Sequence, residues 1–288
     1  MYKNKGNNLD PDNFRAITLI SCLGKIFTSI LNERFTFLAN KISLVSSNQA
    51  GFRKGHPTTD HLFLLQSLIS FYQAFGKKLF CGFSDFRKAF NTVRRMGLWK
   101  KTINSGIKGK IFIVVYNMYD NIKSCITVNN LNSFPHRQGE NLCTFLFSIF
   151  LNDLENLFSE SNISPLEQIQ EKSFQELNTL FKIFVILYAD DTVVLAESEE
   201  GMQNALDIFQ LYCKQWKLEV NVNKTTTKIF KRKSRSNFEF KLQHETIEVV
   251  DSFSYLGILF KYNGCFSESR KKLVNQAQKS LFSIYKKY

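Results

Sequence analysis

The chain has 288 residues, of which 44% are hydrophobic, so it is long enough to bury the core of one large domain or two lobes. Lysine and arginine number 38 against 25 acidic residues, and the net charge of +13 favours a polyanionic partner such as nucleic acid. The six cysteines form no Cys-x-x-Cys pair and the four histidines are scattered, which argues against a zinc site and for reduced thiols. No apolar run approaches the roughly 18 residues of a membrane span, and the first residues are polar. We therefore expect an intracellular protein of the cytoplasm or nucleus that is not secreted and contacts no membrane.

Helices and strands are expected to alternate along the chain. Apolar residues recur at helical spacing in residues 23–31 and 60–69, so the first 75 residues favour helices. From about 76 to 250 the pattern predicts strands around Asp85, Val128 and Asp190 and helices near residues 99–101, 145–154 and 202–216. A basic, amphipathic helix is expected over residues 267–288. This order predicts an α+β fold in which a few antiparallel strands are backed by helices on one face.

Two adjacent carboxylates, Asp190 and Asp191, stand between two apolar stretches of strand length, residues 184–187 and 193–196. The pattern predicts a buried β-hairpin with both carboxylates at its tip. Asp also favours turns for structural reasons alone, and an isolated segment of this kind is more often a plain turn. The functional alternative is a cation between the two carboxylates, because like charges held side by side repel.

A third carboxylate, Asp85, favours the cation. An apolar stretch, residues 79–84, ends at Asp85 and runs into basic residues with helical character. By itself Asp85 could cap that helix. The end of a strand is also where α/β-type sheets present their chemistry. Together with Asp190 and Asp191 it forms a set of three carboxylates, the ligand type that Mg²⁺ prefers.

Five short motifs follow one another along the chain: FSDFRKAF at 83–90, RQG at 137–139, YADD at 188–191, NKT at 223–225 and YLG at 255–257. Upstream stand NFRAITL at 13–19 and QAGFRKG at 49–55. In this order the motifs resemble the reverse transcriptases of non-LTR (LINE-type) retrotransposons, whose fingers carry the two upstream motifs. The resemblance covers nearly the whole chain from about Tyr2, and five ordered motifs are far more specific than any one of them.

The resemblance implies a right-hand polymerase fold. Helical fingers would occupy residues 1–75, a palm with an antiparallel sheet backed by helices residues 76–250, and a primer-grip hairpin with the start of a truncated thumb residues 251–288. The implied activity is that of an RNA-directed DNA polymerase, which transfers nucleotides onto a primer 3′-hydroxyl. Its partners would be an RNA template, a DNA primer and deoxynucleoside triphosphates, with the oligomeric state left open.

The resemblance also implies two Mg²⁺ ions, which Mn²⁺ can replace. Two such ions about 3.5 to 4 Å apart stabilise both the attacking and the leaving oxygen of the transfer, so acidic residues must converge from separate strands. Asp85 and Asp190 match the principal ligands, Asp191 a secondary one, and the carbonyl of Phe86 a backbone ligand. Lys224 matches the lysine that protonates the leaving pyrophosphate, although a plain phosphate contact fits it as well.

Five further residues match positions around the nucleotide. Phe90, five residues after Asp85, matches the bulky aromatic that excludes a 2′-hydroxyl, although it is also one of 29 phenylalanines that could simply pack a helix. Gln138 can donate to the sugar or phosphate, and Gly139 lets the backbone approach the nucleotide closely. Arg15 and Arg53 fall where guanidinium groups neutralise the triphosphate.

The primer and the duplex have candidate contacts as well. Residues 255–257, which are Tyr255, Leu256 and Gly257, resemble the hairpin that grips the primer end, although an ordinary strand would look the same. Basic residues along which a template–primer duplex could lie are Lys224, Lys228, Lys231, Arg232, Lys233, Arg235, Arg270, Lys271 and Lys272.

Three departures from the family pattern bear on activity. Asn91 replaces an aspartate that is not a metal ligand. Cys143-Thr144 replaces Ser-Pro and so removes a proline suited to the first turn of a helix. The loop at 133–137, beside the nucleotide pocket, is several residues shorter than in the family. An alternative is therefore a catalytically decayed retrotransposon remnant that retains only nucleic-acid binding. A different two-metal enzyme such as a nuclease would explain three carboxylates but not the YADD context behind RQG.

Overall fold

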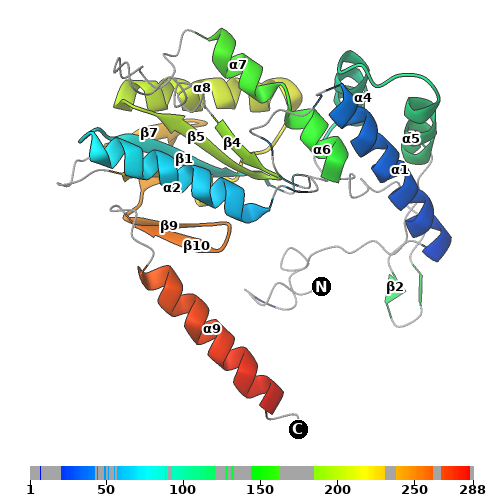
Figure 1. Cartoon of the computed structure of the whole chain (residues 1–288). Helices are drawn as coiled ribbons and strands as arrows, with labels where there is room; N and C mark the ends of the chain where they lie inside the picture. The colour runs from blue at the N-terminus through cyan, green and yellow to red at the C-terminus, as the bar shows by residue number, and fades with distance from the viewer. Residues whose placement is uncertain are drawn as a thin grey trace.

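The structure is a computed structural model that describes residues 21–42, 57–87, 93–120, 127–128, 131–132, 144–161, 185–230, 238–261 and 267–285, together with the single residues Asn7, Leu44, Gln49, Gly51, Gly55 and Ala89. Its centre is a six-stranded sheet in the order β4-β5-β1-β6-β8-β7 (Figure 1). The strands are β1 (Leu79–Asp85), β4 (Val185–Tyr188), β5 (Asp191–Ala196), β6 (Thr226–Phe230), β7 (Phe240–Leu242) and β8 (Glu245–Val249).

The sheet is mixed, so the expected antiparallel sheet is confirmed only in part. All neighbouring strands run antiparallel except β6 and β8, which are parallel. The parallel pair arises because β7 and β8 form a hairpin that joins the sheet through its second strand. Strand β8 therefore runs in the same direction as β6, and β7 becomes the edge.

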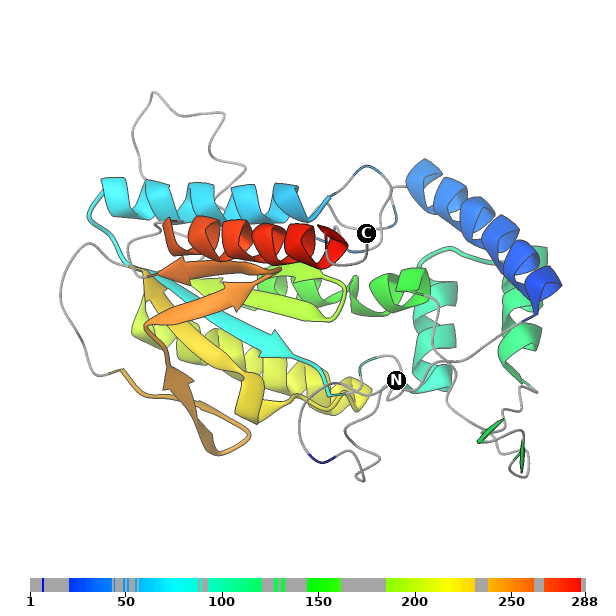
Figure 2. The same cartoon turned by 90° about the horizontal axis from the view of Figure 1, so that it is seen from below.

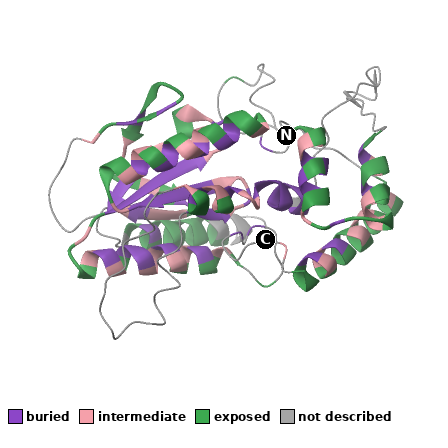
Figure 3. Ribbon diagram, turned by 90° about the horizontal axis from the view of Figure 1, so that it is seen from above, coloured by how far each residue is buried: buried purple, intermediate pink, exposed green. Residues whose placement is uncertain are grey.

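Both faces of the sheet are covered. Phe80 in β1 belongs to one apolar cluster, whereas Leu79, Cys81 and Phe83 belong to another. The first cluster includes buried residues of the helices α6 (Thr144–Leu151), α7 (Leu154–Glu160) and α8 (Glu199–Trp216). The second includes α2 (Thr58–Ala74) and the hairpin of β9 (Ser252–Tyr255) and β10 (Ile258–Lys261). Figure 2, seen from below, shows the β9–β10 hairpin in front of the strands and α8 behind them, and Figure 3 shows the strands coloured as buried.

Helices were expected on one face only, and that expectation was wrong. Every residue of β1 except its last, Asp85, is buried, and a strand that is apolar on both sides needs cover on both sides. Helix α2 supplies the second layer through Leu65, Leu68 and Ile69, which recur at helical spacing and pack in the same cluster as Leu79.

Helix α8 (Glu199–Trp216) confirms the helix expected at 202–216. The Ser198 side chain accepts the N–H of Gly201, two glutamates occupy the first turn, and Lys217 ends the helix in a left-handed conformation. A side chain at Gly82 in β1 would contact Met202 of α8 at 3.3 Å, so this glycine allows the helix to lie close to the sheet.

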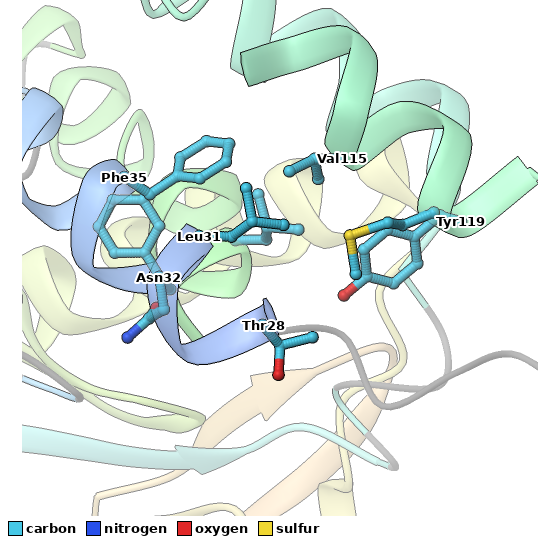
Figure 4. Close-up of a pocket in the computed structure, with 9 residues that line it drawn as sticks. Thr28, Leu31, Asn32, Phe35, Val115 and Tyr119 are labelled. Carbon is cyan, nitrogen blue, oxygen red and sulfur yellow. The ribbon is translucent and has the colours of Figure 1, made fainter. Parts of the chain in front are cut away.

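Three more helices gather at one end of the molecule (Figure 1): α1 (Cys22–Lys41), α4 (Arg95–Asn104) and α5 (Lys110–Asp120). The patterns at 23–31 and 99–101 predicted α1 and α4, and those predictions are confirmed. Helix α5 was missed because its isoleucines and valines are residues with low helix propensity. An apolar pocket lies between α1, α5 and α6 (Figure 4), lined by residues that include Leu31, Phe35, Val115, Tyr119 and Phe145.

A buried lysine ties α4 to the helices that cover the sheet. Lys101 Nζ donates to the Phe150 carbonyl (2.6 Å), to Asp153 Oδ1 (2.6 Å) and to the Tyr212 hydroxyl (2.7 Å), and it lies 3.8 Å from the centre of the Trp216 ring. Burial lowers the pKa of Lys101 to about 8, against the opposing pull of Asp153. The ammonium is therefore both costly to bury and well supplied with acceptors.

The helix expected over 145–154 is broken into α6 and α7. Asn152 Nδ2 donates to the Leu44 carbonyl at 2.7 Å, and Asp153 pairs with Lys101. These contacts attach the break between α6 and α7 to the Leu44 carbonyl and to α4. The predicted strand around Val128 is confirmed as β2 (Thr127–Val128), which pairs with β3 (Leu131–Asn132).

The C-terminal part consists of the β9–β10 hairpin followed by α9 (Ser267–Tyr285), which confirms the helix expected there. The Ser269 hydroxyl accepts the N–H of Leu259 and donates to its carbonyl, each at 2.8 Å, and so attaches the helix to β10. Among the described helices, none is long and apolar enough to cross a membrane.

Candidate active site

The β-hairpin predicted around Asp190 and Asp191 is confirmed. Strands β4 and β5 pair in antiparallel register, with Tyr188 opposite Asp191, and Ala189 and Asp190 form the turn between them. The arms form strands because Val185, Ile186, Val193 and Val194 are fully buried between the two layers that cover the sheet. Ala189 adopts a φ of 60°, a left-handed conformation that glycine occupies more easily than alanine.

Strand β1 brings the third carboxylate to the same end of the sheet. It pairs antiparallel with β5, and the register places Asp85 directly opposite Asp191. Directly opposed residues in such a pair have Cβ atoms about 4.5 to 5.5 Å apart. Two carboxylates therefore face each other on neighbouring strands, and Asp190 stands beside one of them in the turn.

The charges of these carboxylates oppose one another. Asp191 is half-buried, and its pKa is raised to about 6, first by burial and then by the charges of Asp190 and Asp85, while Lys224 acts in the opposite direction. A carboxylate whose ionised form is disfavoured by its neighbours is stabilised by any cation placed among them. The arrangement therefore attracts positive charge.

Lys224 supplies one positive charge. Its Nζ lies 2.6 Å from Asp85 Oδ2, with 67% of the lysine side chain and 25% of the aspartate side chain exposed. Lys224 stands in a short 3₁₀ helix, η3 (Val222–Lys224), that backbone contacts hold against the end of β1. The N–H of Asn221 donates to the Asp85 carbonyl at 2.9 Å, and the N–H of Arg87 donates to the Glu219 carbonyl at 2.7 Å.

The carboxylates suit a hard divalent cation by their chemistry, because oxygen ligands bearing negative charge are those that Mg²⁺ binds. In the part of the chain that the structure describes, no three His, Cys, Asp or Glu side chains already converge as a metal site. The Lys224 ammonium lies against Asp85 instead. Binding of a divalent ion would therefore require the side chains of Asp85 and Lys224 to separate.

Phe86 follows Asp85 and is 3% exposed, with its ring 5.7 Å from that of Phe209. Its backbone forms an isolated antiparallel bridge with Val220. The ring therefore anchors the end of β1 in the core, and the part of its carbonyl as a metal ligand stays a prediction.

The hairpin expected around Tyr255 is present, and its turn carries Leu256 and Gly257 with φ of 47° and 84°. Two positive φ angles in a row are typical of tight hairpin turns. Tyr255 itself is 2% exposed, its ring lies 5.7 Å from that of Phe83, and its hydroxyl has no hydrogen-bond partner among the described residues. Burial, with Asp191 next in effect, raises the pKa of Tyr255 far above its ordinary value. The Tyr255 side chain thus supports the hairpin from inside, and a grip on the primer stays a prediction for the turn.

The nucleotide contacts predicted for Arg15, Arg53, Phe90, Gln138 and Gly139 lie outside the described residues, as do the departures from the family pattern at 133–137, Asn91 and Cys143. Their roles stay predictions.

Lys228 corrects one expectation about the basic surface. It is 1% exposed, and its Nζ donates to the carbonyls of Val250 and Asp251, so it cannot lie along a duplex. Burial lowers its pKa to about 8. By contrast, Arg270, Lys271 and Lys272 on α9 are exposed.

Two residues beside the Asp190 turn were not assigned to the site from the sequence. Gln49 Oε1 accepts the N–H of Ala189, and Gly51 packs against the Ala189 backbone. Gln49 stands 140 residues before Ala189 in the chain, so only the family resemblance of residues 49–55 drew attention to this segment.

The chain is similar to known polymerases. The sequence profile described as "Reverse transcriptase (RNA-dependent DNA polymerase)" matches residues 2–260. The "Probable RNA-directed DNA polymerase from transposon BS" of Drosophila melanogaster is 27% identical over 265 residues, which cover 86% of this chain and 27% of that protein. The "RNA-directed DNA polymerase from mobile element jockey" of the same species is 24% identical over 284 residues, which cover 93% of this chain and 29% of that protein.

These relatives are much longer proteins, and the chain spans less than a third of their length. Among solved structures, telomerase from Candida tropicalis in complex with a TWJ fragment of telomeric RNA matches with a TM-score of 0.50 at 10% identity, over 82% of this chain and 35% of that one. At this identity the likeness shows the fold alone. Because the family profile covers residues 2–260, the chain belongs to the reverse transcriptase family and is related to the polymerases of non-LTR retrotransposons.

Proposed function

We propose that this chain is the RNA-directed DNA polymerase domain of a non-LTR retrotransposon, with fingers, palm and the beginning of a thumb. In this proposal the domain adds deoxynucleotides to a DNA primer 3′-hydroxyl opposite an RNA template. The observation that carries the proposal is the register that sets Asp85 of β1 opposite Asp191 of β5, with Asp190 in the adjoining turn. Carboxylates that converge from separate segments of the chain are what metal-assisted nucleotidyl transfer requires.

Two Mg²⁺ ions, when bound, would stabilise the charge that develops on the attacking and leaving oxygens. Asp85 and Asp190 would hold them as principal ligands, with Asp191 and the Phe86 carbonyl in support. The raised pKa of Asp191 fits this part, because added positive charge would favour its ionised form. In this proposal the pairing of β1 with β5 and of β4 with β5 would bring the three carboxylates to one end of the sheet, which would lower the cost of organising them.

Lys224 would serve the leaving group. Without substrate its ammonium neutralises Asp85 at 2.6 Å. Released from Asp85, the exposed side chain can carry its proton to an oxygen of the departing pyrophosphate, as a general acid does. A contact with the triphosphate that involves no proton transfer is the simpler alternative for this lysine.

The remaining assignments rest on family resemblance. Arg15 and Arg53 would neutralise the triphosphate, Phe90 would exclude ribonucleotides, and Gln138 with Gly139 would lie along the nucleotide. Leu256 and Gly257 would present the primer-grip turn. The exposed basic residues of α9 would contact the template–primer duplex through its phosphates.

The experiment is primer extension by the purified chain on a poly(rA) template with an oligo(dT) primer. Extension in Mg²⁺ or Mn²⁺, abolished by EDTA, is the expected result. A chain that binds the duplex and never extends it contradicts the proposal.

A second candidate is a nucleic-acid-binding remnant without turnover. The ion pair between Lys224 and Asp85 favours it, because the lysine already satisfies the carboxylate that the metal would need. Binding of a labelled RNA–DNA duplex with strong salt dependence, but with no extension in either metal, would support this candidate.

A further inference from the structure

We propose that Gln49 and Gly51 are positioning residues of the Asp190 turn: Gln49 holds the Ala189 peptide in its left-handed conformation, and Gly51 leaves room for it. The inference rests on the proposed function for its catalytic consequence. Its geometric part stands on contacts between the described residues alone.

Gln49 reaches the turn from a distant part of the chain. It is 0% exposed, and its backbone forms an isolated parallel bridge with Leu187 of β4. The side chain turns back so that Oε1 accepts two backbone N–H groups, from Gly51 at 3.0 Å and from Ala189 at 3.3 Å. One amide oxygen therefore links the segment at 49–51 to the residue just before Asp190.

Gly51 is required by the closeness of that contact. A Cβ at this position would lie 2.1 Å from Ala189 N and 2.9 Å from Ala189 Cα, and both are backbone atoms that cannot turn aside. The Ser148 hydroxyl of α6 donates to the Gly51 carbonyl at 3.4 Å, which adds a contact from the helix layer. Any side chain at position 51 would push the turn away from its place.

Ala189 shows why the turn needs support. Its φ of 60° is unfavourable for a residue with a Cβ. Only 5% of the residue is exposed, so the strained turn lies in the interior. The conformation of Ala189 sets the direction in which Asp190 leaves the turn. A contact that fixes the Ala189 peptide therefore fixes the Asp190 carboxylate relative to Asp85.

Amide hydrogen exchange tests the geometry without turnover. In the parent chain the Ala189 N–H should be protected, and Gln49→Met, which keeps the length of the side chain and removes the acceptor, should speed its exchange at least tenfold. The amides of Val193 and Val194 should keep the parent rate, which shows that the hairpin remains folded. Unchanged exchange at Ala189 in a folded Gln49→Met chain overturns the proposal.

Primer-extension kinetics test the catalytic consequence. Gln49→Met should lower kcat about 10-fold to 10²-fold while the KM for the nucleotide stays within about threefold, because a displacement of about 1 Å at a reacting group costs on the order of 10²-fold. Gln203→Met is the matched control. The Gln203 side chain donates to the carbonyl of Lys241 and accepts its N–H, each at 2.9 Å, and Lys241 lies in β7 at the far edge of the sheet. That control should speed exchange at Lys241 and leave kcat at the parent value.

A second substitution separates positioning from general damage. Glycine adopts positive φ without penalty, so adding Ala189→Gly to Gln49→Met should recover a large part of kcat. It should not rescue Gly51→Ala, whose Cβ meets the backbone of residue 189. The positioning role would be overturned if Ala189→Gly changed kcat equally in Gln49→Met and in Gly51→Ala. It would also be overturned if Gln49→Met alone kept the kcat of the parent. A parent that extends no primer defeats the proposed function instead, and the exchange measurement still decides the geometry.

Discussion

Replacing Asp191 by asparagine should stabilise the fold when no divalent ion is present. The pKa of Asp191 is raised from 3.8 to about 6, first by burial and then by Asp190 and Asp85. The protonated Asp191 side chain therefore contributes its full stability below pH 3.8, and this stability is lost as the carboxyl ionises and the pH rises through about 6. A shift of about two units corresponds to roughly 3 kcal/mol. Because Asp191 keeps part of its exposure, we expect a gain of about 1 to 3 kcal/mol at pH 7.

Urea unfolding followed by circular dichroism in EDTA measures this gain. The difference in unfolding free energy between Asp191→Asn and the parent should be small at pH 4, grow between pH 4 and 6, and level off above pH 7. Glu245→Gln is the control, because Glu245 is an exposed carboxylate on β8 away from the cluster. It should change stability by less than about 0.5 kcal/mol at every pH.

The reasoning fails if Asp191→Asn is less stable than the parent at pH 7, or if its effect does not vary with pH. Either result would mean that burial and the neighbouring carboxylates do not raise the pKa of Asp191. Added Mg²⁺ should narrow the difference, because it would stabilise the parent more than the variant.

Three further predictions concern separate parts of the molecule. Burial lowers the pKa of Lys101 from 10.5 to about 8. The free energy of unfolding of the parent relative to Lys101→Met should therefore rise as the pH increases from about 8 to 10.5, and a difference between the two proteins in urea unfolding that stays constant over that range would contradict this. Tyr255→Phe should leave stability unchanged or raise it by up to about 1 kcal/mol, because the buried hydroxyl has no partner among the described residues; a clear loss would reveal a partner. Phe90→Ala should admit ribonucleotides while deoxynucleotide use falls modestly, measured as steady-state incorporation of rCTP against dCTP; equal discrimination in parent and variant would assign Phe90 to core packing.

The Asp190 hairpin was predictable because its signal is local. Two apolar arms of strand length flank a polar turn, and period and length suffice to identify them. The strand that ends at Asp85 follows for the same reason. The placement of Asp85, Asp190 and Asp191 at strand ends, together with the family resemblance, predicted that the three carboxylates converge. The register that sets Asp85 opposite Asp191 was not predicted, because register between distant strands depends on the whole sheet.

The features that were missed depend on contacts between distant parts of the chain. Lys228 looks like a surface cation in the sequence, yet backbone carbonyls at Val250 and Asp251 supply acceptors that allow its burial. No feature of the sequence around Gln49 predicts its hydrogen bond with Ala189, which lies 140 residues later in the chain. The parallel pairing of β6 and β8 depends on which strand of a hairpin reaches the sheet first, and both strands have similar patterns.

The most direct measurement of the central claim is the rate of single-nucleotide addition by the parent and by Asp190→Asn on an RNA template with a DNA primer in Mg²⁺. If Asp190 belongs to the metal-holding centre, the variant should add dTMP at least about 10²-fold to 10³-fold more slowly, the scale on which one preorganised electrostatic contact acts. Its affinity for the duplex should match that of the parent, and Glu245→Gln should match the parent in both rate and affinity. An active parent whose rate is unchanged in Asp190→Asn would contradict the account, because the metal site would then lie elsewhere.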